Sequence, residues 1–318
     1  MSTHKNIPSL DLNDFTNNDA KKKDDFVKNI GIAYEKIGFV AIENHGLSDE
    51  LTKSLYEEVY NFFKLPLEVK LKYEKAELNG QRGYISFGRE TAKGSTKSDL
   101  KEFWHFGQEL DSSDSLFNEY EPNILCEELP NFNQTGRTAF QILEKTGLSI
   151  LRALALHLNL PETYFDQKVK GGNSILRAIH YPPIKTAPKG AVRAAAHGDI
   201  NLITILMGAS AKGLEIQTRS GDWIAVTALP KQVIVNIGDM MSRLTNNKLH
   251  SSIHQVINPP KKDWGTSRFS IPFFMHPRSE MSLNCLNSCI DQKNPKQYED
   301  ITAGQFLEER IKELGLKK

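Results

Sequence analysis

Two side chains of metal-binding type lie close together in the middle of the sequence. His197 and Asp199 are separated by one glycine, and the apolar run INLITILM follows at 200–207. This run predicts a strand, and residues two apart in a strand share one face, so an imidazole and a carboxylate would converge. A second imidazole, His254, lies further along in HSSIHQVINPP. Two histidines and a carboxylate with open coordination positions are the ligand set of non-haem Fe(II) oxygenases.

A candidate site for an anion follows His254. Arg268 and Ser270 form an Arg-x-Ser pair, and in a strand they would share a face. A guanidinium fork and a hydroxyl can then meet one carboxylate. The pairing of Arg268 with a carboxylate of the protein itself is the alternative.

Other interpretations of these residues stay open at this point. His-x-Asp is short enough to arise by chance, and His250 competes with His254 for the place of third ligand. His, Asp and His could also hold zinc in a hydrolase. A binding module without catalysis is a further alternative.

Several motifs, spread over most of the chain, resemble one known family. They are IPSLDL from Ile7, GFVAIENHGL from Gly38, the His-x-Asp pair, NIGDMMSRLTNN from Asn236, the distal histidine, Arg-x-Ser and ITAGQFL from Ile301. Together they resemble the Fe(II)- and 2-oxoglutarate-dependent oxygenases of the isopenicillin N synthase type. We expect a bacterial member of this family whose substrate is not assigned.

The resemblance implies a mainly β fold with flanking helices around a double-stranded β-helix, or jelly roll. It implies that His197, Asp199 and His254 are the catalytic metal ligands, with His250 outside the site. Tyr181 matches a family tyrosine that joins Arg268 and Ser270 in holding the distal carboxylate of 2-oxoglutarate. The plant members have asparagine where this chain has Ile179, so any cosubstrate contact of that asparagine is missing here.

The implied cofactors are Fe(II), 2-oxoglutarate as cosubstrate and O2. The implied reaction is oxidation of a small organic molecule, by hydroxylation in the first place, with release of succinate and CO2. Desaturation and ring closure use the same chemistry. The nearest alternative is an iron oxidase of the isopenicillin N synthase type that needs no 2-oxoglutarate, in which Arg268 would hold a substrate carboxylate. An ethylene-forming enzyme is less favoured.

Periodic apolar residues predict the elements that must position these side chains. Helices are expected over about 26–37, ending at Gly38, over 51–62 with Ser48 as N-cap and Pro66 as terminator, over 137–158, and from Gly304 onward. The last helix would bury Phe306, Ile311 and Leu314. Short β-type runs fill 174–275, which predicts a sandwich or barrel.

Four further features are given structural roles or left open. Residues 79–99 are rich in glycine, serine and charge and predict a long surface loop. Trp104 and His105 could line a substrate pocket, although packing in the core is the simpler explanation. His45 is expected to be a structural hydrogen-bonding residue, and NIGD at 236–239 to be a tight turn without chemistry.

The division of the chain that we expect follows these patterns. It has an N-terminal non-haem dioxygenase region of helices and strands at 1–125 and a linking amphipathic helix at 126–170. The jelly-roll core that binds Fe(II) and 2-oxoglutarate would occupy 171–280. A helical segment at 281–318 ends the chain.

Composition excludes some classes of partner. Lys plus Arg (40) nearly balance Asp plus Glu (39) in 318 residues, so no basic field would attract nucleic acid or anionic lipid. No apolar run is long enough to span a bilayer, and the start of the chain lacks a signal-peptide core. Three cysteines suit a reducing compartment, so we expect a cytoplasmic protein acting on a small molecule. The oligomeric state is not indicated.

Overall fold

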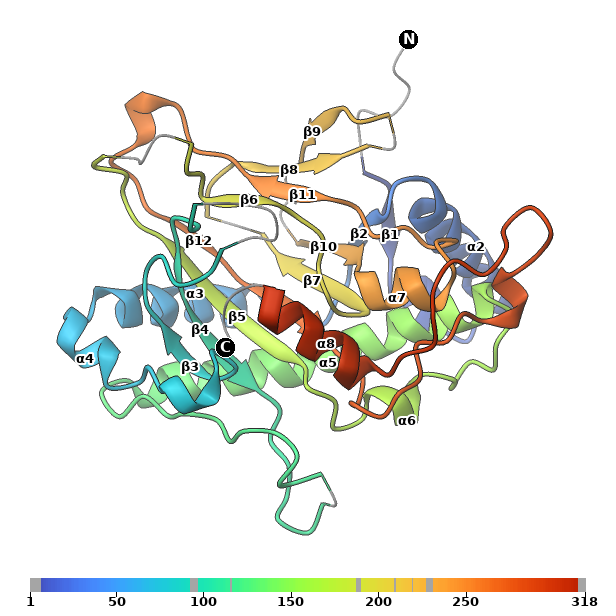
Figure 1. Cartoon of the computed structure of the whole chain (residues 1–318), viewed down its shortest axis with the longest axis horizontal. Coiled ribbons are helices and arrows are strands. Elements are labelled where there is room, and N and C mark those ends of the chain that lie inside the picture. Colours follow the sequence, from blue (N-terminus) through green and yellow to red (C-terminus); the bar gives the residue numbers. More distant parts are fainter. Residues whose placement is uncertain are drawn as a thin grey trace.

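Two facing β-sheets form the centre of the protein in the computed structural model, which describes residues 7–91, 97–114, 116–186, 190–208, 210–218, 220–226 and 231–313. Figure 1 shows the smaller sheet above the larger one. The described strands of the larger sheet are β1 (Ser9–Asp11), β2 (Phe39–Glu43), β10 (Gln232–Ile237), β7 (Ile203–Met207), β13 (Pro272–Met275), β5 (Ile175–Tyr181), β4 (Glu102–Gly107) and β3 (Gly83–Ile85), in that order, with β12 (Arg268–Ser270) paired to β5. The smaller sheet has the order β6 (Ala194–His197), β11 (His254–Val256), β8 (Leu214–Gln217) and β9 (Trp223–Ala225). All these pairings are antiparallel except β1 with β2.

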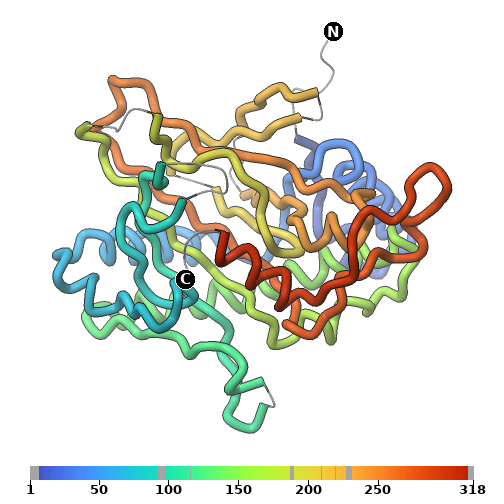
Figure 2. Tube along the Cα trace, in the orientation of Figure 1, coloured from blue at the N-terminus to red at the C-terminus, as the bar shows by residue number. Residues whose placement is uncertain are grey.

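Helices cover the outer face of the larger sheet. The longest is α5 (Pro130–His157), which contacts α2 (Ala20–Lys36), α3 (Asp49–Lys64) and strands β4, β5, β7 and β13. The shorter helices are α1 (Asn13–Thr16), α4 (Leu67–Leu71), α6 (Asp166–Val169) and α7 (Asp239–Leu244), with 3-10 turns at Ala76–Leu78, Lys261–Asp263 and Asn287–Cys289. The last described helix, α8 (Ala303–Glu313), is the red segment that crosses the middle of the view in Figure 2. Among the described residues, no helix combines the length and the hydropathy that a bilayer span requires.

The apolar interior has two main parts. The larger part lies between the helices and the larger sheet, and Trp104 is fully buried in it against Phe62 and Phe132. The second part lies between the two sheets and includes Phe39 and Ile234 from the larger sheet and Ile216 from the smaller one. The candidate site residues border this second part, where two β-surfaces exclude water from both sides.

Local signals in the sequence explain the ends of the helices. The Ser48 side chain accepts a hydrogen bond from the backbone N–H of Leu51, so the predicted N-cap of α3 is confirmed. The chain leaves α2 through Gly38 at φ +78°, a left-handed conformation that glycine adopts without a steric cost. A Cβ atom there would lie 2.5 Å from the carbonyl oxygen of His250, so the glycine also allows two segments to approach each other.

Some expected elements differ from the structure. The predicted loop at 79–99 contains β3, whose short GYI segment pairs with β4, so the prediction of loop alone was wrong there. The strand expected to carry both His197 and Asp199 ends at His197, and Asp199 lies in the following turn. In the last helix Phe306 is buried and Ile311 half-buried, while the expected Leu314 lies outside the described residues.

Candidate active site

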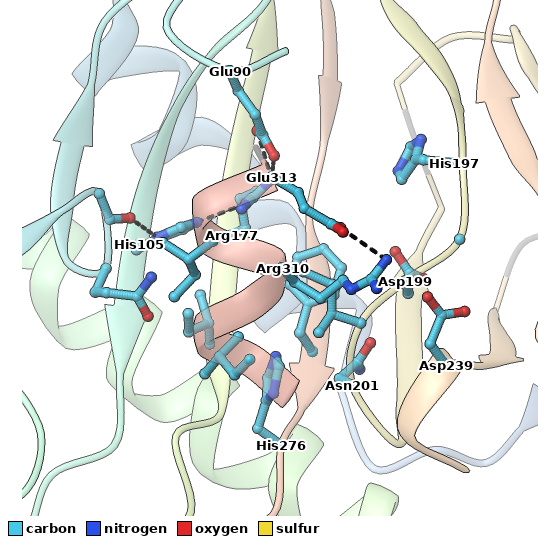
Figure 3. Close-up of a pocket in the computed structure, with 18 of the residues that line it drawn as sticks. Glu90, His105, Arg177, His197, Asp199, Asn201, Asp239, His276, Arg310 and Glu313 are labelled. Carbon is cyan, nitrogen blue, oxygen red and sulfur yellow. Dashed lines mark hydrogen bonds and ion pairs between the residues drawn. The ribbon is translucent and has the colours of Figure 1, made fainter. Parts of the chain in front are cut away.

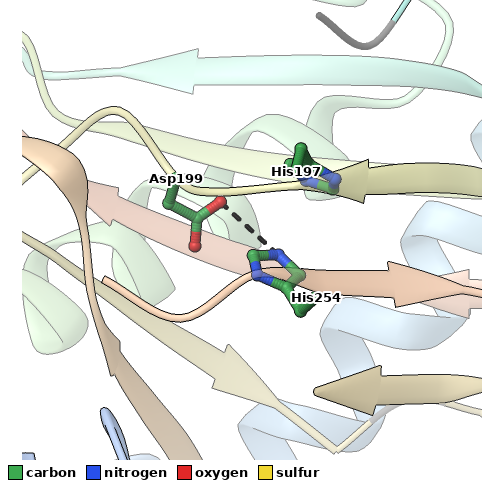
Figure 4. A group of neighbouring side chains, drawn as sticks. All are labelled: His197, Asp199 and His254. Carbon is green, nitrogen blue, oxygen red and sulfur yellow. Dashed lines mark ion pairs between the residues drawn. The ribbon is translucent and has the colours of Figure 1, made fainter. Parts of the chain in front are cut away.

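Three side chains converge at one end of the smaller sheet. One ligand-type atom from each of His197, Asp199 and His254 lies within 4.8 Å of the others. His197 and His254 are directly opposite each other in β6 and β11, with ring centroids 4.5 Å apart. His254 Nε2 is 3.7 Å from Asp199 Oδ1, the contact drawn in Figure 4. No other group of this composition occurs within the described ranges.

Both imidazoles are oriented by their own backbone. His197 Nδ1 lies 2.7 Å from the carbonyl oxygen of Ala195, and His254 Nδ1 lies 3.3 Å from that of Ser252. A donor N–H at Nδ1 fixes the tautomer and leaves Nε2 with a free lone pair. Burial and the nearby His254 lower the pKa of His197, so its ring is neutral at neutral pH. A neutral imidazole is the form that binds a metal.

The Asp199 carboxylate is held from the larger sheet. Its Oδ2 accepts hydrogen bonds of 2.7 Å from Thr204 Oγ1 and from Asn236 Nδ2. Thr204 and Asn236 are directly opposite each other in β7 and β10, so one cross-strand pair holds the carboxylate through Oδ2. The other carboxylate oxygen, Oδ1, is then directed toward His254. Burial works to raise the pKa of Asp199, but the two histidines and these two hydrogen bonds hold it below its ordinary value.

The turn at 236–239 clamps the segment that carries Asp199. The backbone N–H of Asp239 donates to the carbonyl oxygen of Asp199 at 2.7 Å. A Cβ at Gly238 would lie 2.1 Å from the carbonyl oxygen of Asn201, so only glycine permits this approach. The interpretation of this motif as a turn without chemistry was therefore incomplete, because Asn236 supports a candidate metal ligand.

A small cavity of about 70 Å³ extends from the three side chains between the sheets. Arg268, Ser270 and Tyr181 all line it, and Arg268 is directly opposite Tyr181 in the pairing of β12 with β5. Arg268 and Ser270 are both buried, which places them on the same face of β12 as predicted. Arg268 Nη1 is buried without a hydrogen-bond partner among the described residues. A carboxylate in the cavity would provide that partner, so these residues fit 2-oxoglutarate.

A larger cavity of about 320 Å³ reaches the same group from another side. His197 and Asp199 line both cavities, as do Lys101, Arg177 and Phe274. Strands β4, β5 and β13 form its floor, and α8 contributes Leu307, Arg310 and Ile311. In Figure 3, Arg310 extends from α8 toward Asp199. This arrangement leaves room for one molecule on each side of a metal ion.

Four charged groups form one wall of the larger cavity, and all of them except the half-buried Arg177 are buried. Glu90 lies 3.1 Å from Arg177 and 3.2 Å from Lys101, and Lys101 lies 2.8 Å from Asp99. The Arg177 guanidinium stacks between Phe103 and Phe274, at 4.2 and 5.2 Å from their ring centroids. Burial works to raise the pKa of Glu90, but the two cations outweigh it and hold this pKa far below its ordinary value.

The remaining histidines and aromatic residues divide between the site and the core. His105 lines the larger cavity and accepts a hydrogen bond from Arg177 Nε at 2.6 Å, whereas Trp104, its neighbour in β4, packs in the core. His45 accepts a hydrogen bond from the backbone of Leu47, a structural role as expected. His250 does not belong to the metal-type group. Cys126, Cys285 and Cys289 are free and buried.

The sequence predicts part of this arrangement and misses part of it. Thr204, Glu90 and Lys101 were not singled out, because ordinary polar residues at these positions have no recognisable spacing, and Asn236 was interpreted only as part of a turn. The register of β7 with β10 brings Thr204 and Asn236 together, and only a three-dimensional pairing reveals it.

Comparison with known proteins agrees with this geometry. Residues 7–128 match the family model "non-haem dioxygenase in morphine synthesis N-terminal", and residues 172–277 match the "2OG-Fe(II) oxygenase superfamily". The proline hydroxylase buaE of Petromyces alliaceus is 32% identical over 96% of this chain and 98% of its own length.

Solved structures of similar proteins also belong to proteins that are described as 2OG-Fe(II) oxygenases or that bind alpha-KG. A protein from Caulobacter crescentus, assigned to the 2OG-Fe(II) oxygenase family, is 38% identical with a TM-score of 0.87, over 97% of this chain and 99% of its own. A full-length Neurospora crassa protein, solved in complex with alpha-KG and also with alpha-KG and thymine, is 28% identical with a TM-score of 0.85, over 98% of each chain.

The chain therefore belongs to the 2OG-Fe(II) oxygenase superfamily. It is an Fe(II)- and 2-oxoglutarate-dependent dioxygenase that oxidises a small organic molecule, with release of succinate and CO2. The predictions of the jelly-roll fold, the enzyme class and the cofactors are confirmed. The zinc hydrolase and the binding module without catalysis are thereby excluded.

Proposed function

We propose that His197, Asp199 and His254 bind the Fe(II) of this dioxygenase. The observation that carries this proposal is their convergence at the point where both cavities meet. Iron bound there would supply the activation of O2 that is coupled to oxidative decarboxylation of 2-oxoglutarate. The side chains supply fixed donors: two imidazoles with their tautomers set, and a carboxylate held by Thr204 and Asn236.

We propose that the smaller cavity takes 2-oxoglutarate. Arg268 would pair with the distal carboxylate through its unpartnered Nη1, and Ser270 and Tyr181 would complete that end. The other end of the cavity reaches the metal ligands, so the 2-oxo acid group would lie against the iron. Ile179 lines this cavity as well and provides an apolar wall in place of an amide.

The larger cavity is the proposed substrate site. Its volume suits a small molecule, and the similar Neurospora crassa protein is known in complex with thymine. The buried charges of Glu90 and Lys101 and the half-buried charge of Arg177 favour a substrate that carries hydrogen-bonding groups, because a hydrocarbon would leave them poorly solvated. We expect hydroxylation of a C–H bond that these groups hold near His197 and Asp199.

The partners and the location remain predictions. The charge balance gives no reason to expect nucleic acid as a partner, and the three unpaired cysteines agree with a cytoplasmic enzyme. A bacterial source also remains a prediction, since the similar proteins are fungal or bacterial.

An anaerobic binding experiment tests the residue assignments. Protein with Fe(II) and 2-oxoglutarate should develop the weak visible absorption of a chelated 2-oxo acid, and O2 should then yield succinate slowly even without substrate. Both signals should be lost in His254→Ala and retained in His250→Ala, the matched control. Loss in His250→Ala alone would move the third ligand to His250. Absence of both signals in the iron-loaded wild type would contradict the proposed cosubstrate site and would assign Arg268 to a substrate carboxylate.

A further inference from the structure

A second buried arginine is the sequence neighbour of a residue that lines the smaller cavity. Arg193 is 2% exposed, and it immediately precedes Ala194, which lines this cavity. Its Nη2 donates to the carbonyl oxygen of Thr266 at 3.0 Å, while its Nε is buried without a partner among the described residues. Arg193 therefore carries a full charge in the interior with little hydrogen bonding to offset its desolvation.

Arg193 and Arg268 share one aromatic ring. The guanidinium carbon of Arg268 is 5.0 Å from the centroid of the Tyr181 ring, and that of Arg193 is 5.9 Å from the same centroid. Tyr181 and Arg268 both line the cavity. Both cations therefore lie close to the ring of Tyr181, which lines the cavity where a distal carboxylate would lie.

No described carboxylate lies within ion-pair distance of either arginine. Elsewhere in the site the buried Lys101 is paired with Asp99, and the half-buried Arg177 is paired with Glu90. Burial is the main cause that lowers the pKa of Arg193, and the charge of Arg268 lowers it further. This agrees with two like charges that lie near each other without a described counter-ion. Two buried like charges are costly unless an anion joins them.

We propose that Arg193 is a second arginine of the 2-oxoglutarate site, a positioning residue whose charge acts with Arg268 on the distal carboxylate. This inference rests on the proposed function, because it takes the smaller cavity as the cosubstrate site. With two arginines and no carboxylate of the protein beside them, the site has an excess of positive charge until its anion binds. Binding of 2-oxoglutarate should consequently relieve the repulsion between the two arginines and stabilise the whole protein.

A pair of ligands isolates the distal carboxylate. 2-Oxopentanoate has the same 2-oxo acid end as 2-oxoglutarate but a methyl group where the cosubstrate has its distal carboxylate. Binding of each to protein loaded with Mn(II), measured by calorimetry, gives a ratio of dissociation constants that reports the contribution of that carboxylate. In Arg193→Met we expect this ratio to fall about tenfold through weaker binding of 2-oxoglutarate alone.

Thermal unfolding separates this role from simple packing. Arg193→Met without ligand should be as stable as the wild type or more so, because an apolar side chain replaces an uncompensated charge. The rise in unfolding midpoint caused by 2-oxoglutarate should be smaller than in the wild type. Arg243→Met is the matched control, since Arg243 also donates to a backbone carbonyl, stacks on aromatic rings and has a buried Nε without a described partner. The Arg243→Met variant should be less stable than the wild type and should keep the wild-type ratio of the two dissociation constants.

Three outcomes decide against the proposal. Equal weakening of both ligands together with a lower midpoint in Arg193→Met would show that Arg193 only packs. If Arg193→Met does not fold, Arg193→Lys is the second variant, because it keeps the charge. Its ratio of dissociation constants should stay within about threefold of the wild-type ratio. A fall of this ratio in the lysine variant as large as the one expected for Arg193→Met would exclude an electrostatic role. A wild type that binds both ligands equally would instead contradict the proposed cosubstrate site itself.

Discussion

Every candidate metal ligand is oriented by a neighbour that belongs to the protein. His197 and His254 contact backbone carbonyls two residues before them, and Asp199 contacts the pair formed by Thr204 and Asn236. These contacts are made within the protein itself, so metal binding need not order the side chains first. Outer contacts of this kind commonly change metal affinity by about 10- to 100-fold when they are removed.

Asn236→Ala tests this support. The variant removes one of the two hydrogen bonds to Asp199 Oδ2, and we expect Fe(II) affinity to fall by about tenfold or more, since a hydrogen bond to a charged group contributes about 1.5–3 kcal/mol. Anaerobic titration with Fe(II) measures the change.

Asn133→Ala provides the comparison. Asn133 makes two hydrogen bonds to the backbone of Cys126, far along the chain from the metal ligands. Its loss should lower stability and leave Fe(II) affinity unchanged. Equal Fe(II) affinity in Asn236→Ala and the wild type would show that Thr204 alone positions the carboxylate.

At the level of secondary structure, the turn after α2 is tied to the strand that carries His254. A Cβ at Gly38 would lie 2.2 Å from Ser252 Oγ and 2.5 Å from the carbonyl oxygen of His250. Ser252 in turn donates to the carbonyl oxygen of Ile37 at 2.7 Å and provides the carbonyl that orients His254. The geometry of this turn therefore sets where β11 begins.

Gly38→Ala should disturb both stability and metal binding. The positive φ costs about 1 kcal/mol for a non-glycine residue, and the clash adds to it by displacing 250–252. Gly221→Ala is a matched control, because Gly221 has φ +90° but a methyl group there would meet no described atom within 4 Å. Chemical denaturation and Fe(II) titration should show a loss of stability in both variants and a loss of Fe(II) affinity only in Gly38→Ala. Intact Fe(II) binding in Gly38→Ala would show that β11 tolerates the shift.

Local patterns predict elements well where one signal dominates. Helices α2, α3 and α5 and most strands between 174 and 275 occur in the regions where apolar periodicity, caps and glycine predict them, but α2 begins at Ala20 and α5 at Pro130, six and seven residues before the expected starts. Strand β1 is only three residues long, and β3 lies in a polar, glycine-rich stretch, so their pairing with β2 and β4 decides their conformation. The end of β6 at His197 depends on the docking of the next turn onto α7, which no local pattern records.

On the scale of the whole molecule, distant parts of the chain build one site. Gln81, Glu90, Asp99, Lys101 and His105 form part of the wall of the larger cavity, and α8 borders that cavity from the C-terminal side. His197, Asp199 and His254 form the metal-type group. The sequence motifs predict the metal ligands, whereas the substrate walls depend on how these parts pack. The division at 125, 170 and 280 stays a prediction.

Buried neutral histidine makes the stability of the whole fold depend on pH. Burial lowers the pKa of His276 to about 4, while the unfolded chain takes up a proton near pH 6.5. Between these values the unfolded state binds more protons, so stability falls as pH falls through this window and is unaffected by this group above it.

Denaturation at several pH values tests this dependence. Because the unfolded group is only half protonated at pH 6.5, His276 should contribute a total loss of about 1.6 kcal/mol between pH 6.5 and 5, with a slope that approaches about 1.4 kcal/mol per pH unit near pH 5. His276→Gln should remove this contribution from the wild-type curve. Curves of equal slope for the two proteins would show that the folded protein also protonates His276 in this range.

The linked charges in the wall of the larger cavity also constrain how this enzyme can evolve. Glu90 forms ion pairs with both Arg177 and Lys101, and Lys101 also forms an ion pair with Asp99. Loss of Lys101 would leave the buried Asp99 without its cation, at a cost of about 3–5 kcal/mol, and loss of Glu90 would leave Arg177 without its carboxylate. The first cost is a large share of the stability of an ordinary domain. A lineage that shifts to a new substrate by altering this wall must therefore change charges in pairs or first accumulate stabilising mutations elsewhere. Apolar positions such as Leu307 and Ile311 carry no such penalty, and divergence in substrate preference should begin on that side of the cavity.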